Sequence, residues 1–413
     1  MAEWIVSLAA LEKNAQTLRR VADAAGAHIV LALKGFSTTA CLPLIARYAD
    51  GCCASGLWEA RLGRDYMQKP VCAYSPAYRD DELAELLAFA RHIDFNSLSQ
   101  WRRFRDQALA HPRARNGELL FGLRINPEFS TGHTPLYDPC APGSRLGIPA
   151  VQLEGADLEG ISGLHFHTLC EQGAEDLAST WAAIEKRFGA RLASPSLRYV
   201  NMGGGHWITQ PGYDENLLVT TVRSARERYG VDVVLEPGEA WCIHTGVLRA
   251  RVLDVFESMG TRHAIVDVSA SAHMPDVLEM PYRPEVFLAL SGDGERGEPR
   301  GHAEGEARPA VVLPGERYAR AGEAGEGPHT YRLGAPTCLA GDVIGDYSFA
   351  RPLTVGDTLV FDDMAHYTLV KTTFFNGAPH PPVSVQRADG TLVRVKEWSY
   401  RDFESRLGGG EPL

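Results

Sequence analysis

The chain has 413 residues, of which 45% are hydrophobic and 23% are charged, so it can bury a large core and is neither a disordered nor a fibrous protein. Its 41 basic and 52 acidic residues leave a formal net charge of −11, which argues against nucleic-acid binding and favours a cationic small partner. No apolar stretch approaches the roughly 20 residues of a membrane span, so no membrane association is expected.

Short apolar runs alternate with amphipathic segments, such as 81–91 and 176–188, from residue 8 to about residue 245. This repeated alternation of strand and helix predicts a parallel (β/α)8 barrel over residues 1–245, with a doubly wound sheet as the competing fold. The barrel is favoured because chemically interesting residues follow the ends of separate runs, where barrel active sites lie. The runs cover residues 28–33, 71–74, 119–125, 161–166, 197–202 and 232–235.

After about residue 245 the pattern becomes rich in β-branched and apolar residues, which predicts a mainly β domain over residues 246–413. The expected strands cover residues 247–255, 264–268, 358–361, 384–387 and 391–394. The segment 291–328 consists mostly of Gly, Glu, Arg, Ala and Pro, so we expect a surface insertion that is partly disordered. Because the chain starts close to the barrel, the first strand of the β domain is expected to be short or missing.

The eight cysteines include no Cys-x-x-Cys pair and no zinc-finger spacing, and no secretory signal precedes them. Reduced thiols in the cytoplasm are the simplest expectation. Cys338 lies in a loop defined by glycine and proline, where a thiol can donate a proton, although most buried cysteines only pack.

Lys34 closes the first apolar run, and a desolvated lysine at a strand end can act as a nucleophile that forms a Schiff base. A lysine that merely reaches solvent is the more common case. Gly203, Gly204 and Gly205 follow another run, and successive backbone N–H groups there can close around a phosphate, although a simple turn is the alternative. The glycines match neither GxxxxGK[ST] nor GxGxxG, which argues against nucleotide binding.

Glu236 closes a further run and is followed by a Pro-Gly turn, so its carboxylate can hold a proton on a heterocyclic nitrogen; an exposed turn glutamate is the alternative. Lysine, phosphate loop and carboxylate together fit pyridoxal 5'-phosphate (PLP). His165 and His167 alternate along one strand. They either form part of a zinc site, for which no third ligand is evident, or place one imidazole against a cofactor ring. Tyr367 offers a phenol that can bind phosphate, with a structural tyrosine as the default.

Five motifs in order along the chain resemble the carboxynorspermidine/carboxyspermidine decarboxylases, which belong to the alanine racemase-like, fold-type III PLP enzymes. The resemblance runs from about residue 6 to about residue 394. It implies an N-terminal PLP-binding barrel, a C-terminal β domain and a homodimer with active sites shared between subunits. The motifs are Ala-Leu-Lys at 32–34, Gly-Gly-Gly-His at 203–206, Glu-Pro-Gly-Glu at 236–239, His-Met-Pro-Asp at 273–276 and Cys-Leu-Ala-Gly-Asp at 338–342.

The resemblance also implies a role for each site residue. Two residues are expected to be catalytic: Lys34 binds PLP covalently, and Cys338 comes from the partner subunit to face the reacting carbon. Ornithine and diaminopimelate decarboxylases place an arginine where Glu239 stands, and Glu239 and Asp276 are expected to receive the ammonium groups of the substrate. The remaining cofactor contacts would be His167 on the ring, Glu236 on the pyridine nitrogen, the glycines 203, 204, 205 and 238, and Tyr367 near the phosphate.

The resemblance therefore implies decarboxylation of carboxynorspermidine, carboxyspermidine or both, to norspermidine and spermidine, in polyamine biosynthesis. Three alternatives stay open. A decarboxylase of diaminopimelate or another basic amino acid shares the fold and the cofactor. A non-catalytic PLP-binding homologue would be expected to lose Lys34 or Cys338, and both are present. A barrel metallohydrolase would use His165 and His167 to bind zinc.

Overall fold

The computed structural model describes residues 1–132, 134–290 and 307–409 and divides the chain into two compact units. Residues Glu12–Trp241 form the barrel unit, and Met1–Leu11 with Cys242–Leu413 form the β unit. No helix within these ranges is long and apolar enough to cross a membrane.

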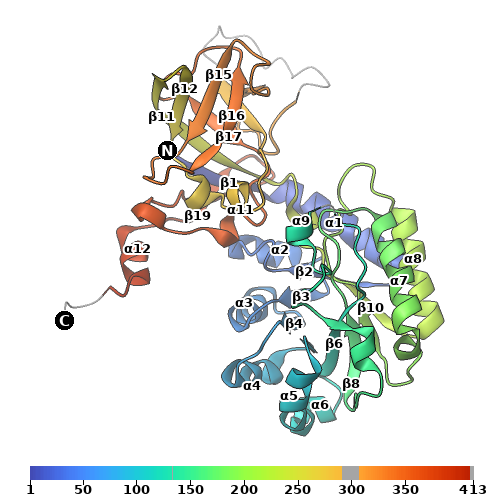
Figure 1. Cartoon of the computed structure of the whole chain (residues 1–413). Coiled ribbons are helices and arrows are strands. Elements are labelled where there is room, and N and C mark those ends of the chain that lie inside the picture. Colours follow the sequence, from blue (N-terminus) through green and yellow to red (C-terminus); the bar gives the residue numbers. More distant parts are fainter. Residues whose placement is uncertain (133, 291–306, 410–413) are drawn as a thin grey trace. The chain divides into compact units, whose positions relative to one another are not determined.

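Eight parallel strands within the described residues close into the barrel (Figure 1). Hydrogen bonding runs around the ring in the order β2-β3-β4-β5-β6-β8-β9-β10 and returns from β10 to β2, and the short β7 pairs with β6 outside the ring. The predicted barrel is thus confirmed, including two strands, β3 and β5, that the apolar runs did not reveal. The bounds are β2 (His28–Ala32), β3 (Gly51–Ala54), β4 (Val71–Ser75), β5 (His92–Phe95), β6 (Leu120–Asn126), β7 (Ile148–Pro149), β8 (Ile161–His165), β9 (Tyr199–Asn201) and β10 (Asp232–Leu235).

Helices follow most barrel strands and pack their apolar faces against them, because leucines and aromatic residues recur every three to four positions. Local signals fix the ends of α8: the Asp214 side chain accepts the N–H of Leu217, and Gly230 ends the helix with a φ of +64°. The helices are α1 (Leu8–Ala25), α2 (Leu42–Ile45), α3 (Leu57–Met67), α4 (Asp80–Phe89), α5 (Leu98–Ala110), α6 (Pro112–Arg115), α7 (Ala174–Leu192), α8 (Glu215–Tyr229) and α9 (Glu239–Cys242).

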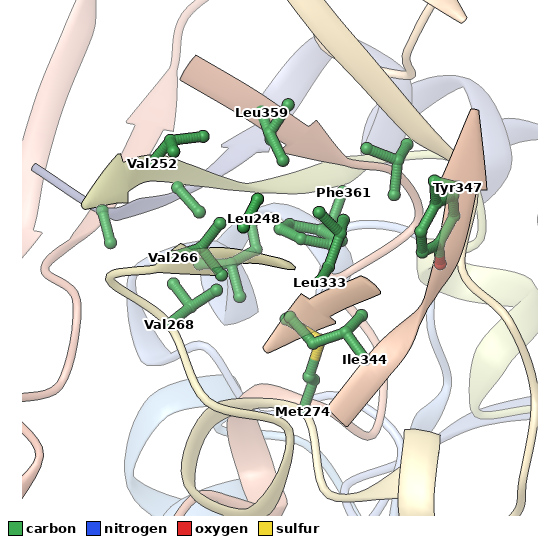
Figure 2. Close-up of a cluster of buried hydrophobic side chains, with 14 of the residues drawn as sticks. Leu248, Val252, Val266, Val268, Met274, Leu333, Ile344, Tyr347, Leu359 and Phe361 are labelled. Carbon is green, nitrogen blue, oxygen red and sulfur yellow. The ribbon is translucent and has the colours of Figure 1, made fainter. Parts of the chain in front are cut away.

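The β unit is built on one sheet with the strand order β14-β13-β17-β11-β1-β18-β19, which β12, β15 and β16 extend from β11. Its main core fills the space between these strands with Leu248, Leu333 and Phe361, all fully buried (Figure 2). The bounds are β1 (Glu3–Ser7), β11 (Gly246–Ser258), β12 (Thr261–Val266), β13 (Val286–Leu290), β14 (Arg317–Arg320), β15 (His329–Gly334), β16 (Val343–Phe349), β17 (Thr358–Phe361), β18 (Val383–Gln386) and β19 (Leu392–Lys396), with helices α10 (Ala270–His273), α11 (Asp276–Glu279) and α12 (Tyr400–Arg406).

The N-terminus corrects the expected domain boundaries. The first strand of the β unit is neither short nor missing: β1 is a five-residue strand that pairs with β11 on one side and β18 on the other. Residues 1–11 therefore belong with the β unit rather than with the expected barrel domain 1–245. The reason is burial, since Trp4 and Ile5 are fully buried in the cores of that unit.

The expected insertion 291–328 also needs correction over the part that the structure describes. Residues 291–306 lie outside the described residues, but β14 pairs with β13 at the edge of the sheet. Val311 is buried, and Glu316 forms an ion pair with Arg249 at 2.7 Å. A charged edge strand has a composition that resembles a loop, because charged side chains protect an unpaired edge.

Candidate active site

A pocket lies at the carboxyl ends of the barrel strands, the position where barrel enzymes carry their active sites. Its walls come from β2, β3, β4, β6, β8 and β10 or from the residues that directly follow them. The lining residues are Ala32, Lys34, Cys53, Ala54, Ser55, Tyr74, Arg124, His165, His167 and Glu236. Three of the predicted site residues, Lys34, His167 and Glu236, are thus brought together from far apart in the sequence.

Lys34 lies two residues beyond β2. Hydrogen bonds to residues of β3 and of the segment after β10 fix the backbone just before it. The N–H of Ala32 donates to the carbonyl of Pro237, and the N–H of Leu33 donates to the carbonyl of Cys53. The lysine side chain is exposed, and within the described ranges its ammonium has no hydrogen-bond or ion-pair partner. This arrangement leaves the amine available for a covalent bond, while the backbone from which the side chain extends is fixed.

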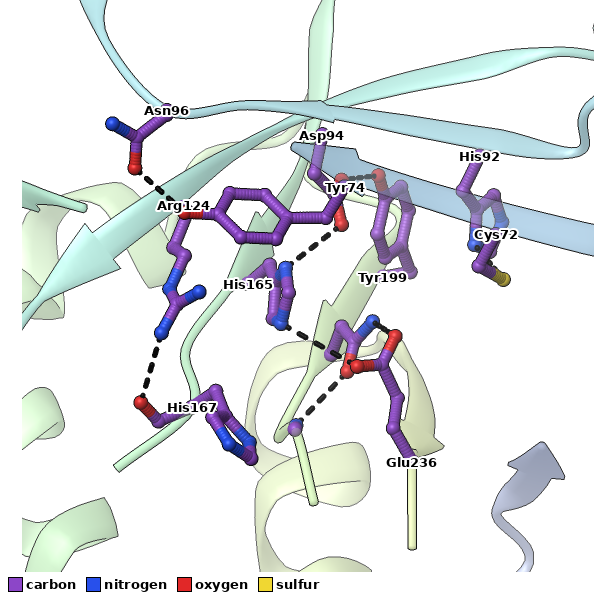
Figure 3. Close-up of polar contacts among 12 residues, drawn as sticks. Cys72, Tyr74, His92, Asp94, Asn96, Arg124, His165, His167, Tyr199 and Glu236 are labelled. Atoms are coloured by element: carbon purple, nitrogen blue, oxygen red, sulfur yellow. Dashed lines mark hydrogen bonds and ion pairs between the residues drawn. The ribbon is translucent and has the colours of Figure 1, made fainter. Parts of the chain in front are cut away.

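Glu236 directly follows β10 and directs a largely buried carboxylate toward the pocket (Figure 3). Asn201 Nδ2 donates to Oε1 at 2.6 Å, and His165 Nε2 lies 3.6 Å from Oε2. The N–H of Glu236 donates to the carbonyl of Gly203, which ties β10 to the glycine loop. Such a carboxylate can accept one further hydrogen bond from a group in the pocket.

Hydrogen bonds hold both the ring and the backbone of His167. Its Nδ1 accepts the N–H of Gly204 at 2.9 Å, and its backbone carbonyl accepts a hydrogen bond from Arg124 at 3.2 Å. Burial and the positive charges of Lys34 and Arg124 hold the pKa of His167 well below its usual range. The imidazole is therefore neutral, with its proton on Nε2, and can lie against an uncharged aromatic surface.

The glycine loop has a different structural role from the one its sequence predicts. Gly203 and Gly205 have φ values of +70° and +83°, and a Cβ on Gly204 would lie 2.2 Å from the carbonyl oxygen of Glu236. The N–H groups of Gly203 and Gly204 donate to Asn201 and His167. Among the three, only the N–H of Gly205 lacks an acceptor in the described part of the chain, so three successive N–H groups do not form a phosphate cradle.

Arg124 and Tyr74 line the pocket but were not predicted. Arg124 is buried and lies over the Tyr74 ring, 4.5 Å from its centroid, while the Tyr74 hydroxyl donates to Asn96. Arg124 lies inside the apolar run 119–125, one residue before its end, so a charged residue within an apolar run is the sequence signal that identifies it. No such signal exists for Tyr74, whose hydrophobic ring is an ordinary strand residue.

Cys338 lies in an exposed loop of the β unit, where one residue holds it. Both its N–H and its thiol donate to Oδ1 of Asn376, at 3.1 and 3.0 Å. Asn376 adopts a left-handed backbone with a φ of +59°, a conformation that asparagine tolerates. The loop itself is anchored by the buried Asp342, which accepts hydrogen bonds from Thr337 and Ser269. Asn376 was not predicted, because it is 38 residues from Cys338 in sequence.

The remaining predicted residues lie outside the lined pocket. Glu239 begins α9, directly after Gly238, in the barrel unit. Asp276 and Tyr367 belong to the β unit and are half-buried or more deeply buried. Asp276 is already paired with a cation, because Lys371 Nζ donates to it and also lies 2.6 Å from Glu279. Its predicted contact with a substrate ammonium must therefore share or replace the Lys371 contact.

The donor set of the pocket fits PLP better than it fits a metal. A partner-free amine, a neutral imidazole and a hydrogen-bonded carboxylate face one space, and these groups suit an aldehyde, a ring face and a ring nitrogen respectively. Within the residues the structure describes, no three His, Cys, Asp or Glu side chains are grouped as metal ligands. The fold and the pocket define the class of barrel enzymes that use PLP, built from a PLP-binding barrel and a mainly β domain.

Comparison with known proteins identifies the family. Residues 21–365 match the family described as pyridoxal-dependent decarboxylase, C-terminal sheet domain. The chain is 41% identical to a carboxyaminopropylagmatine decarboxylase of Synechocystis sp. over 96% of this chain and 93% of that one. It is 39% identical to a carboxynorspermidine/carboxyspermidine decarboxylase of Campylobacter jejuni, over 96% and 95%. The crystal structure of the C. jejuni carboxynorspermidine decarboxylase with norspermidine superposes with a TM-score of 0.82 at 37% identity, covering 98% of this chain and 99% of that one. The chain belongs to the pyridoxal-dependent decarboxylases and uses PLP.

Proposed function

We propose that this enzyme decarboxylates carboxynorspermidine, carboxyspermidine or both, yielding norspermidine and spermidine. The observation that carries the proposal is the pocket in which Lys34, His167 and Glu236 converge, in a chain that matches the C. jejuni carboxynorspermidine/carboxyspermidine decarboxylase over nearly its whole length. When bound, the cofactor supplies an electron sink for the bond that breaks at Cα.

Each of these residues would hold a different part of the cofactor. The amine of Lys34 would bind the cofactor aldehyde covalently. Glu236 would hold the proton on the pyridine nitrogen, and the neutral ring of His167 would contact the cofactor ring. The N–H of Gly205 would donate to the phosphate, with Tyr367 as a further phosphate contact. The other glycines, including Gly238, allow the backbones to approach closely: a Cβ on Gly35 would lie 3.1 Å from Gly238 Cα.

Acidic residues would receive the cationic tail of the substrate. The amino acid end of a carboxylated triamine leaves two further amines, and Glu239 and Asp276 are the proposed partners. A charge-assisted hydrogen bond contributes about 1.5–3 kcal/mol, so Glu239→Gln is expected to raise KM for the triamine roughly tenfold or more while cofactor binding is retained. An unchanged KM would remove Glu239 from the substrate site. Asp276 requires the tail to compete with Lys371 for the same carboxylate.

Cys338 would return a proton to Cα from the partner subunit of a homodimer. Its thiol is exposed on the β unit, and the adjacent Leu339 and the nearby loop residue Phe375 are also exposed large apolar side chains. Exposed apolar side chains around a reactive thiol support burial against a second copy of the chain. The eight cysteines are all free, which supports a reducing compartment and hence the cytoplasm.

A second candidate substrate is carboxyaminopropylagmatine, since the Synechocystis relative that acts on it is 41% identical to this chain. Both substrate types present a carboxylated aminopropyl end and differ at the far end, which is an ammonium in the triamines and a guanidinium in the agmatine derivative. Substrate specificity therefore depends on the residues that contact the far end of the substrate and not on the pocket that holds the cofactor.

A substrate panel distinguishes these candidates. We would measure CO2 release by purified holoenzyme with carboxynorspermidine, carboxyspermidine, carboxyaminopropylagmatine and meso-diaminopimelate. The highest kcat/KM is expected with a carboxylated triamine. A higher value with carboxyaminopropylagmatine would replace the proposed substrate, and a higher value with diaminopimelate would assign the enzyme to the basic amino-acid decarboxylases. No turnover of any of them by protein that carries bound PLP would favour a non-catalytic homologue.

A further inference from the structure

A row of buried polar side chains crosses the barrel interior from Glu236 to β5 (Figure 3). His165 Nε2 lies 3.6 Å from Glu236 Oε2, and His165 Nδ1 lies 3.2 Å from Asp94 Oδ2. The side chains of His165 and Asp94 are each only 2% exposed. Neither buried ring nitrogen of His165 forms a hydrogen bond, so these two carboxylates are the polar groups that the imidazole contacts.

The charged partners of the two carboxylates in this row are the next feature. In the described part of the chain, no lysine or arginine forms an ion pair with Asp94 or Glu236. Burying a carboxylate without a charged partner is costly, so these two carboxylates depend on the imidazole between them and on the hydrogen bonds from Tyr199 and Asn201. Arg124, which lines the pocket, donates to the carbonyl of His167 and covers the Tyr74 ring.

The barrel makes room for this row and locks its far end. The Tyr199 hydroxyl donates to Asp94 Oδ1. A Cβ on Gly122 would lie 2.2 Å from that same oxygen, and a Cβ on Gly163 would lie 2.0 Å from the Tyr199 ring. Glycines in the middle of strands weaken those strands, so their presence beside Asp94 and Tyr199 indicates that this space is needed.

We propose that Asp94 and His165 are positioning residues that act on the cofactor through Glu236. Asp94 orients the imidazole, and the imidazole in turn orients the Glu236 side chain so that it faces the pocket. The Asp94–His165 pair thus resembles the carboxylate–imidazole pair of a catalytic triad, with a second carboxylate in place of the nucleophile. The inference rests on the proposed function, in which Glu236 meets the pyridine nitrogen.

The functional consequence concerns the proton on that nitrogen. The two carboxylates of the row place negative charge near that nitrogen, and this charge stabilises a protonated pyridine ring. The other ionisable groups around the row include Tyr74 from β4, Arg124 from β6, His167 after β8, Cys53 from β3 and Lys34, together with Tyr78 and Tyr199 at Asp94 and with Cys72 and His92 beyond Tyr199. Asp94 is the member whose charge can be removed without touching the pocket, because it does not line it.

The test uses holoenzyme reconstituted with 15N-labelled PLP, in which the nitrogen chemical shift reports whether the ring nitrogen is protonated. Wild type is expected to keep this proton across the neutral range. Asp94→Asn is expected to lose it at a lower pH than wild type, because one negative charge is removed. Its kcat is expected to fall roughly tenfold to a hundredfold, the range seen when the partner of a metal-bound imidazole is removed, with KM little changed.

Tyr199→Phe is the matched control, because it removes a hydrogen bond from the same carboxylate but removes no charge. A purely structural role for Asp94 predicts the same nitrogen signal in both variants, and that result would overturn the inference. Should Asp94→Asn fail to fold, His165→Gln decides instead, because it removes the imidazole that links Asp94 to Glu236. The ring nitrogen of the labelled cofactor is then expected to lose its proton at a lower pH than in wild type, and a signal that matches wild type would also overturn the inference.

These outcomes are separate from a failure of the proposed function. If wild-type protein binds no PLP or releases CO2 from no substrate in the panel, the proposed function fails. If wild type is active and the nitrogen signal of Asp94→Asn matches that of wild type, only the role of Asp94 and His165 is rejected.

Discussion

The barrel pocket and the Cys338 loop present reactive groups in opposite ways. In the barrel, Glu236 and His167 lie at strand ends and are held by partners from neighbouring strands. In the β unit, Cys338 lies in an exposed loop, and both of its hydrogen bonds go to the single side chain of Asn376. The barrel groups are therefore oriented by the fold, whereas the thiol is oriented locally.

This difference indicates how each region can change. Strand ends in a closed barrel cannot move without breaking a ladder of hydrogen bonds, so the cofactor pocket is rigid. A loop tolerates movement and substitution, which suits the role proposed for Cys338 at a partner subunit.

The largest effect is expected from a substitution of Lys34 in the barrel pocket. Lys34→Ala removes the amine that we propose bonds the cofactor, so activity is expected to be abolished and the absorbance of the lysine-bound cofactor to disappear. Kinetics and an absorbance spectrum measure this. Lys69→Ala is the control, since Lys69 is also an exposed barrel lysine but does not line the pocket. Full activity in Lys34→Ala would refute the assignment of the pocket.

Cys338→Ala tests the exposed loop of the β unit and is expected to have a smaller effect on activity than Lys34→Ala. A proton donor contributes roughly 10²- to 10⁴-fold, so kcat is expected to fall by at least about a hundredfold while the cofactor spectrum stays that of wild type. Cys140→Ala is the control; burial raises the pKa of Cys140 to about 12, and it does not line the pocket. If Cys338→Ala retained wild-type kcat, another group would donate the proton.

Gly163→Ala tests how rigid the barrel interior is. The new Cβ would meet the Tyr199 ring, and overpacking of this kind costs roughly 1–3 kcal/mol, so the melting temperature is expected to fall. Gly189→Ala in α7 is the opposite control, because no atom lies within 4 Å of its Cβ position and alanine favours the helix. Equal stability of the two variants would show that the barrel core adapts to an extra methyl group.

The smallest effect is expected in the response to acid. Burial lowers the pKa of His92 in the barrel to about 4 and that of His273 in the β unit to about 3. Between pH 6.5 and these values only the unfolded chain is protonated at these rings, so the free energy of unfolding decreases as the pH falls.

Thermal unfolding at pH 7 and pH 5 measures this dependence. His92→Phe keeps an aromatic ring against Tyr199 and is expected to reduce the loss of stability on acidification, and His273→Phe is expected to do the same for the β unit. The exposed His28→Gln serves as the control. An unchanged pH dependence in both buried variants would contradict the assigned cause.

Much of the architecture could be predicted from local patterns. Residues such as Lys34 and Glu236 stand out because a charged side chain at the end of an apolar run is costly to place there without a use. A charged residue inside such a run, Arg124, was overlooked. The strands β3 and β5 were missed because Gly51 in the first strand, and His92 and Asp94 in the second, interrupt the apolar pattern.

By itself the sequence determined the order of strands and helices, the charged strand ends and the motifs that identify the family, because these depend on neighbours in the chain. Only the tertiary structure decided that Asp94, His165 and Glu236 form one row, since β5, β8 and β10 meet only when the barrel closes. It likewise decided that the N–H groups of Gly203 and Gly204 donate hydrogen bonds within the chain and that Lys371 donates to Asp276. Hydrogen bonds and ion pairs depend on distance in space, and that distance is set by packing rather than by position in the chain.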